Sequence, residues 1–370
     1  MWRWIYLISA ETTDNTLINI TKTGIAMKKL KTTVALVATL GALYSTSAMS
    51  QTVMRFASWM PPTHPVNEVV LPTWKKWIED ATDNRVTLAV EYNMGHPKTM
   101  FNLVEDGVAD ASWGYHGYVP GRFRLTQIVE QPLLGVSAEA ASVAHWRVHN
   151  KYFQGAPEFD GLELVALVTH GPGQVHSTFP VNSISDLQNK KIRIGGGVQA
   201  VIGERAGLVP VAGPAPKVYE MLQQGVIDGV FLPVCDVKNL RLDEVITHTT
   251  QLPGGMYLGS FSFFINPDFL ADLDPKDRDA ILKVSGEQLS ALGGRAQDES
   301  DVAGLEAAKA AGVNINVVAE GAPLAQEYAQ LAEGIDDAWI ESVADLKVDA
   351  RAALDELRAV ARAYQAELDK

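Results

Sequence analysis

The chain has 370 residues, of which 47% are hydrophobic and 20% charged, an ordinary globular composition that excludes disordered and fibrous classes. Its formal charge of -13 at pH 7 disfavours a nucleic-acid partner, because such a partner requires a basic surface. An anionic ligand would therefore need a local positive site.

Residues 27–50 have the order of features that is typical of a secretory signal peptide. Met27 is followed by closely spaced lysines, then by an apolar run over 34–44, then by small residues. The apolar run is too short to span a bilayer comfortably. We predict export to the periplasm, cleavage near Ala48 or Ser50, and a true translation start at Met27, so that everything before the cleavage point lies outside the fold.

Cys235 is the single cysteine of the chain, which excludes an intrachain disulfide and a CxxC site for redox chemistry or zinc. A lone thiol in an oxidising compartment is more often a small buried hydrophobe than a nucleophile. We therefore expect Cys235 to be buried and inert.

Strand and helix patterns alternate in the first part of the exported chain. In chain order the predicted elements are a strand at 53–60, a helix at 66–78, a strand at 85–92, a helix at 97–107 and a strand at 108–114. This βαβαβ order predicts helices that cover a mainly parallel sheet.

The same alternation occurs again further along the chain. The predicted elements are strands at 162–170 and 190–194, a helix at 198–207, a strand at 207–212, a helix at 215–225 and a strand at 226–233. Two such βα halves predict two α/β domains with a cleft between them.

The last part of the chain is predicted to connect the two domains. A strand at 257–267 returns to the first domain, another strand lies at 313–320, and the segment from 323 is rich in Ala, Glu and Leu. The predicted parts are domain I at 51–172 with 255–285, domain II at 173–254 with 286–322, and helices at 323–370 that pack across both.

Four segments carry recognisable motifs. They are GHPKTMFNLVEDGVADASWGYHGYVPGRF (95–123), ISDLQNKKIRI (184–194), PAPKVYEMLQQGVIDGV (214–230) and FINPDFLADLDPKDRDAIL (264–282). In this order and spacing they resemble the solute-binding proteins of tripartite ATP-independent periplasmic (TRAP) transporters, the dicarboxylate-transporter-like DctP family. The resemblance implies a periplasmic-binding-protein-like α/β fold that closes on a small organic acid and delivers it to the membrane subunits of an ion-gradient-driven permease.

The resemblance assigns a role to Arg193. In the family, the arginine of the motif resembling KIRI forms a bidentate salt bridge with the ligand carboxylate, and a planar guanidinium matches a carboxylate with two parallel hydrogen bonds. The glycines from Gly195 onward, which precede a helix predicted to start near Val198, are expected to add backbone NH groups to the same anion site. The alternative is a solvated surface charge.

Two positions depart from the family pattern. Where members that bind polar acids often carry Glu and Asn, this chain has Phe231 and Leu232, which removes hydrogen-bonding capacity from the predicted cleft wall. Where sialic-acid binders often carry a second arginine, this chain has Gly173. The polar residues close to that place are His170, Gln174 and His176. We predict a monocarboxylate with an apolar or aromatic body; a dicarboxylate or sugar acid is the alternative, and each histidine is alternatively a satisfied loop residue.

Several rings of the first predicted domain fall where the family lines its cleft. These residues are Trp59, His64, Trp113, Tyr115 and His116. Their rings would cover an aromatic or branched acid, and the alternative is ordinary core packing. Arg122 either contacts the ligand or braces the hinge between the domains, and Tyr257 is expected to reach the cleft from below.

An enzyme is the first competing class. The glycines at 195–197 lack the GxxxxGK[ST] and GxGxxG spacings of nucleotide loops, and no HExxH, GxSxG or SxxK motif occurs. We predict no catalytic residues, no cofactor and no metal. A binding protein of an ATP-driven importer, or a sensor module, would share the fold and remains an alternative.

Overall fold

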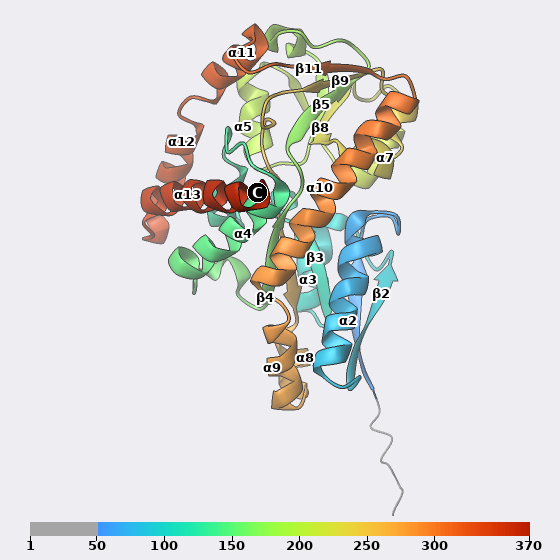
Figure 1. Cartoon of the computed structure of the whole chain (residues 1–370), viewed down its shortest axis with the longest axis vertical. Coiled ribbons are helices and arrows are strands. Elements are labelled where there is room, and N and C mark those ends of the chain that lie inside the picture. Colours follow the sequence, from blue (N-terminus) through green and yellow to red (C-terminus); the bar gives the residue numbers. More distant parts are fainter. Residues whose placement is uncertain (1–50) are drawn as a thin grey trace, which may run out of the picture. The chain divides into compact units, whose positions relative to one another are not determined.

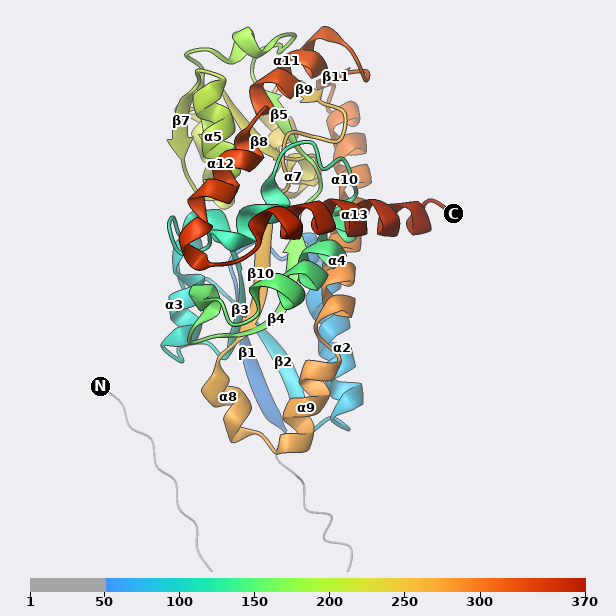
Figure 2. The same ribbon diagram turned by 90° about the vertical axis from the view of Figure 1, so that its left-hand side faces the viewer.

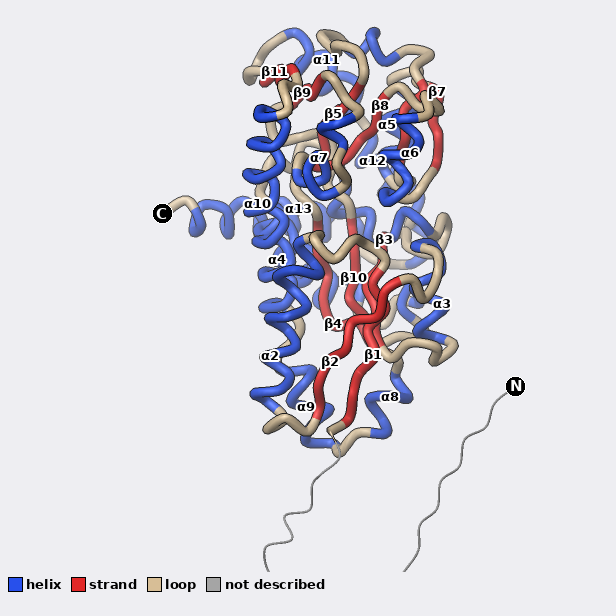
Figure 3. The backbone as a smooth tube through the Cα atoms, turned by 90° about the vertical axis from the view of Figure 1, so that its right-hand side faces the viewer, coloured by secondary structure: helices blue, strands red, loops and turns tan. Residues whose placement is uncertain are grey.

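Two β-sheets organise residues 51–370, the part of the chain that the computed structural model describes. The predicted translation start and signal peptide lie outside these residues. The first sheet has the strand order β2-β1-β3-β10-β4, and the second has the order β11-β9-β5-β8-β6-β7. In Figure 3 the labelled strands of the first sheet lie in the lower half of the described chain and those of the second sheet in the upper half.

The strand bounds of the first sheet are β1 (Thr52–Ser58), β2 (Val86–Tyr92), β3 (Ala111–Tyr115), β4 (Glu163–Thr169) and β10 (Ser260–Ile265). Those of the second sheet are β5 (Gly173–Ser177), β6 (Lys191–Ile194), β7 (Val209–Ala212), β8 (Gly229–Pro233), β9 (His248–Gln251) and β11 (Asn314–Val317). The strands β5 and β9 were not predicted from the sequence.

The first βαβ unit has the predicted form. Strands β1 and β2 pair in parallel over their full length, and α2 (Leu71–Ala81) connects them with a proline at its start. Trp74 and Ile78, one helical turn apart, are fully buried, and the Trp74 ring meets Phe56 of β1 edge to face at 6.2 Å. Burial of these rings fixes the helix on the sheet.

Both sheets are mainly parallel, as predicted, with one antiparallel strand in each. Strand β10 is antiparallel to β3 and β4, and β5 is antiparallel to β8 and β9. Only residues 170–172 separate β4 of the first sheet from β5 of the second. The chain passes directly from one sheet to the other there, and β10 brings it back.

The helices cover the sheets and connect them. Besides α2 they are α3 (Met100–Glu105), α4 (Ala138–Val148), α5 (Val198–Arg205), α6 (Val218–Gln223), α7 (Cys235–Asn239), α8 (Pro267–Asp272), α9 (Pro275–Lys283), α10 (Glu287–Ala310), α11 (Pro323–Ala332), α12 (Ile335–Ser342) and α13 (Ala350–Leu368). Among residues 51–370 no helix combines the length and the apolar character needed to cross a bilayer.

Helix α10 runs past both sheets, as Figure 1 shows. It presents carboxylates to the first residues of two other helices. Asp298 accepts hydrogen bonds from the backbone N–H groups of Ala138 and Glu139 at the start of α4, and Asp301 accepts one from Cys235 at the start of α7. Because helix N-termini carry unpaired N–H groups and partial positive charge, these contacts attach α10 to the helices of both halves.

The C-terminal helices pack on both halves. Leu324 and Tyr328 of α11 lie in the core around β5 and β6, and the Tyr328 hydroxyl donates to the carbonyl of Met256. Leu354 and Leu357 of α13 pack in the core around α4. Figure 2 shows α13 crossing the junction between the halves. Residues 51–370 form one compact unit, so the domain limits within it remain a prediction.

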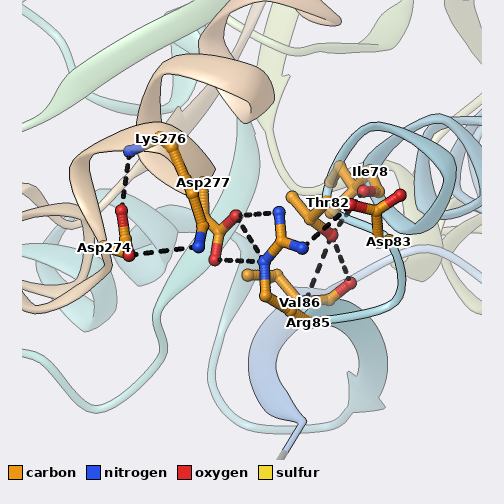
Figure 4. Close-up of polar contacts among 8 residues, drawn as sticks. All are labelled: Ile78, Thr82, Asp83, Arg85, Val86, Asp274, Lys276 and Asp277. Carbon is orange, nitrogen blue, oxygen red and sulfur yellow. Dashed lines mark hydrogen bonds and ion pairs between the residues drawn. The ribbon is translucent and has the colours of Figure 1, made fainter. Parts of the chain in front are cut away.

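An ion pair anchors the end of the first sheet that lies opposite the second sheet (Figure 4). Arg85, directly before β2, places Nε 2.9 Å and Nη2 2.7 Å from Oδ1 of Asp277 in the first turn of α9. Asp277 is buried. Beside it, the Thr82 hydroxyl donates to the carbonyl of Ile78 and accepts from the N–H of Val86, which closes α2 onto β2.

We expect Asp277→Ala to lower the Tm by ~4 °C, because a bidentate, buried contact between β2 and α9 is lost. Asp80→Ala is the matched control, since Asp80 pairs only with the exposed Lys76 one helical turn away. Its Tm should stay within about 1 °C of wild type. Thermal unfolding followed by circular dichroism measures both; equal shifts would contradict a structural role for Asp277.

Candidate functional site

A narrow cavity lies between the two sheets and is lined from both. Its volume is about 30 Å³. The lining residues that the sequence predicted are Trp59, His64, Trp113, Tyr115, His170, Arg193 and Leu232. The lining residues that it did not predict are Met60, Tyr118, Gln199, Ala215, Pro233, Asp236, Phe261 and Gln297.

Arg193 is the charged centre of this lining. It lies on β6, between β7 and β8, and because side chains alternate along a strand, Ile192 and Ile194 enter the core while Arg193 faces the cavity. Its Nε donates to the carbonyl of Gly213 at 2.8 Å and its Nη2 to the hydroxyl of Tyr118 at 3.1 Å. The guanidinium is thereby held in one orientation.

The charge of Arg193 is not neutralised by the protein. The residue is only 2% exposed, and no carboxylate of residues 51–370 forms an ion pair with it. A buried charge without a partner costs several kcal/mol, so the site is complementary to an anion. Tyr118 adds a donor, because its hydroxyl oxygen already accepts from Arg193 and from the N–H of Ala215, which leaves its proton free.

Asp236 lines the same cavity and does not act as a full counter-charge. Burial raises the pKa of its carboxyl to about 7; the charge of Arg193 opposes this rise and that of Asp301 adds to it. At neutral pH the group is therefore partly protonated. Its Oδ1 is buried without a hydrogen-bond partner among the described residues.

Aromatic rings form one wall of the cavity. Trp59 and Trp113 stack with centroids 4.6 Å apart, and Phe261 lies 5.5 Å from Trp113 and 5.0 Å from Tyr115. Both indole N–H groups are used within the protein: that of Trp59 donates to the carbonyl of Trp113, and that of Trp113 donates to the hydroxyl of Ser58. The wall thus offers carbon surface and ring faces to a ligand.

The two histidines of the lining are neutral at physiological pH. Burial lowers the pKa of His64 to about 3 and that of His170 to about 4. Arg193 is the only Arg or Lys among the lining residues of the described chain. The cavity therefore contains one fixed positive charge.

Two of the backbone N–H groups expected to serve an anion after Arg193 are used within the protein. The N–H of Gly195 donates to Oε1 of Gln199, and the N–H of Val198 donates to Oε2 of Glu130, so both backbone donors are used by the protein. Gly196 and Gly197 have φ of +102° and +62°. A Cβ on Gly196 would lie 2.3 Å from the carbonyl oxygen of Gly117. The glycines are needed for close approach of the two sheets' loops.

Glu130 connects the two halves beside these glycines. It lies at the end of the short 3-10 helix Leu125–Glu130 and is 1% exposed. Its Oε1 accepts from the N–H of Ser260 on β10 and its Oε2 from the N–H of Val198 on α5. Burial raises the pKa of Glu130 to about 7, an effect that the two backbone donors oppose.

Three predicted site residues on β5 and β8 lie outside the cavity lining, but only Phe231 faces the other side of its strand, since Gln174 pairs in register with Leu232 and His176 with Val230. Leu232 lines the cavity, but its neighbour Phe231 enters the core on the opposite face of β8. On β5, Gln174 accepts from the N–H of Leu252, and His176 contacts the hydroxyl of Thr249 at 3.0 Å. These contacts hold β5 to its neighbours.

Four further predicted residues lie outside the cavity lining and contact other parts of the protein instead. Arg122 pairs with Glu105 at 2.6 Å, and its Nε donates to the carbonyl of Glu158. His116 contacts the hydroxyls of Ser260 and Ser262. The ring of Tyr257 is buried and packs edge to face against the ring of His170. The N–H of Gly195 donates to the side chain of Gln199, which lines the cavity. The positions of these residues in or near the recognised motifs did not predict which parts of the protein they contact.

Some of the lining residues that the sequence analysis missed could have been found from the sequence, and others could not. Tyr118 belongs to a motif already quoted, and Phe261 pairs in register with Tyr115, so a sheet model would have found it. Asp236 and Gln297 belong to no motif and are brought to the cavity by α7 and α10. Cys235 is a buried free thiol, as predicted. Residues 51–370 contain no cluster of three His, Cys, Asp or Glu side chains suited to a metal ion.

Sequence comparison relates the chain to transport proteins. The family model described as bacterial extracellular solute-binding protein, family 7 (DctP), matches residues 56–334. A Comamonas testosteroni protein named outer membrane transporter protein TsaT is 29% identical over 329 residues, which is 88% of this chain and 96% of that protein.

Two solved structures have the same fold. A TRAP periplasmic solute-binding protein from Bordetella bronchiseptica with bound (R)- and (S)-mandelate is 36% identical, with a TM-score of 0.82 over 85% of this chain and 99% of that one. A TRAP solute-binding protein from Rhodoferax ferrireducens in complex with copurified benzoate is 27% identical, with a TM-score of 0.80 over 86% of this chain and 100% of that one.

The buried Glu130 predicts a pH dependence of stability. An unfolded glutamate ionises near 4.5 and Glu130 in the folded protein near 7, so the folded state holds a proton that the unfolded state releases. The stabilisation from this proton is fully present below pH 4.5 and is lost as pH rises through 7, a change of up to about 3 kcal/mol.

Glu130→Gln removes this titration but also one of the two accepted hydrogen bonds. We expect the variant to be less stable than wild type at pH 5 and to lose this deficit by pH 8, as measured by urea unfolding at both pH values. Asp236 and Asp301 titrate in both proteins and cancel in the comparison. A deficit that does not change with pH would contradict the raised pKa.

Proposed function

Because the chain belongs to the DctP family of bacterial extracellular solute-binding proteins (family 7), we propose that it binds a small aromatic monocarboxylate and delivers it to the membrane subunits of a TRAP permease. The family is one of extracytoplasmic transport proteins rather than enzymes. The predicted fold class and the resemblance to TRAP solute-binding proteins are confirmed by these comparisons. The TRAP match also favours this system over the ATP-driven importer or sensor module.

The observation that carries this proposal is the unpaired, buried guanidinium of Arg193. Gly213 and Tyr118 hold it from the two halves of the molecule, and the Tyr118 proton is available beside it. A ligand carboxylate would supply the missing negative charge through charge-assisted hydrogen bonds, which are about twice as strong as neutral ones. The same ligand would join the two sheets, because its contacts come from both.

The shape and polarity of the cavity support an aromatic body. Rings of Trp59, Trp113 and Phe261 line one wall, and Leu232 adds apolar surface from β8. These rings would pack against the faces of a flat aromatic body. Mandelate and benzoate, which the two related proteins bind, are acids of this shape.

The charge of the cavity supports one carboxylate rather than two. Arg193 is the single cation of the lining, and the two lining histidines are neutral. A second carboxylate would have no cationic partner and would meet Asp236, so a dicarboxylate is disfavoured. A sugar acid is disfavoured too, since the ring-lined wall provides few hydrogen-bonding groups for its hydroxyls.

We expect Arg193→Ala to weaken binding of benzoate and mandelate at least tenfold, because a charge-assisted pair is lost. Isothermal titration calorimetry of residues 51–370 measures the Kd. Arg122→Ala is the matched control; it should lower the Tm through loss of the Glu105 pair but leave the Kd within about twofold. Unchanged affinity in Arg193→Ala would overturn the carboxylate anchor.

Adjacent residues on β8 test the proposed cavity wall. Leu232→Phe adds a ring to a cavity of about 30 Å³ and should reduce affinity for benzoate at least tenfold. Phe231→Leu, on the opposite face, should lower the Tm by leaving a gap in the core while the Kd stays near wild type. Calorimetry and thermal unfolding separate the two effects; the opposite result would mean that Phe231 faces the ligand.

A further inference from the structure

We propose that Asp236 and Gln297 form a polar subsite that recognises a hydroxyl group on the bound acid. This inference rests on the proposed function, since Arg193 must already hold the carboxylate of the same ligand. It narrows the ligand class from aromatic acids in general to hydroxy-substituted aromatic acids.

Asp236 provides an unused acceptor in the cavity. It lines the cavity, is only 5% exposed, and accepts no side-chain hydrogen bond from any group in residues 51–370. Arg193 does not form an ion pair with it, and the nearby N–H of Cys235 is bound to Asp301 instead. A buried carboxyl oxygen without a partner carries a desolvation cost, which a ligand donor would remove.

Gln297 provides an unused donor from the facing helix. It lies on α10, is 2% exposed and lines the same cavity. Its Oε1 accepts from the thiol of Cys235 at 3.5 Å, which leaves Nε2 with no hydrogen-bond partner in the described part of the chain. Helices α7 and α10 lie side by side in Figures 1 and 3, and Asp236 and Gln297 both line the cavity.

The combination of one acceptor and one donor selects the ligand group. A hydroxyl donates through its hydrogen and accepts through its oxygen, so it pairs with both Asp236 and Gln297. An ammonium has only donors and would leave the Gln297 amide N–H unpaired. A second carboxylate has only acceptors and would face Asp236. An unsubstituted ring would leave both protein groups without a ligand partner, which is why a hydroxyl is favoured over hydrogen.

The test uses acids that differ only in the hydroxyl: mandelate against phenylacetate, and 3-hydroxybenzoate against benzoate. Calorimetry of the wild-type protein should give at least tenfold tighter binding for the hydroxylated member of at least one pair. In Asp236→Leu and in Gln297→Leu that ratio should fall at least fivefold, whatever the absolute affinity for the unsubstituted acid. Retained binding of the unsubstituted acid also demonstrates that the variants fold.

Gln288→Leu, at the exposed start of α10, is the matched control and should keep the wild-type ratio. Phenylglycine replaces the mandelate hydroxyl by an ammonium; if the wild type prefers it, the hydroxyl subsite is overturned. A ratio near one in the wild type, or one unchanged in both variants, overturns the subsite and leaves the proposed function intact. If none of these acids binds, the proposed function fails and the subsite fails with it.

Discussion

The charge of Arg193, buried between two sheets without a carboxylate partner, is the constraint on which the site depends. The protein gives it hydrogen bonds from Gly213 and Tyr118 but no neutralising group. The buried carboxyl of Asp236 lies in the same cavity lining and has a pKa near 7, so it compensates the charge of Arg193 only in part. A ligand anion, as proposed, would remove this energetic deficit.

Hydrogen bonds from side chains and backbone groups near Arg193 connect the two halves of the molecule. Tyr118 reaches Arg193, the Gln199 amide donates to the Tyr115 hydroxyl, and Glu130 accepts from both β10 and α5. The glycines at 196 and 197 permit this approach, because a Cβ at either would collide with the opposite half. Carboxylates of α10 cap helices on both sides. The cavity is thus a product of how the halves meet.

Family membership and local chemistry describe the function at different levels. The DctP match identifies an extracytoplasmic solute-binding protein of TRAP transport. In our proposal, the single cation and the ring-lined wall favour a monocarboxylate with an aromatic body, and the unused acceptor and donor of Asp236 and Gln297 narrow the ligand class further. Each step of the proposal depends on a different set of side chains, and the last depends on the first.

The sequence by itself determined most of the strands and helices, the motif that carries Arg193, and the presence of aromatic rings and Leu232 near it, because these depend on local periodicity and on short motifs. It did not determine that β5 and β10 run antiparallel, that Phe231 faces the core, or that Arg122 and His116 are structural. Those outcomes depend on register and on which strands pair. Only the tertiary structure placed Asp236 and Gln297 in the cavity, since their positions follow from the packing of α7 against α10, a contact between segments about sixty residues apart.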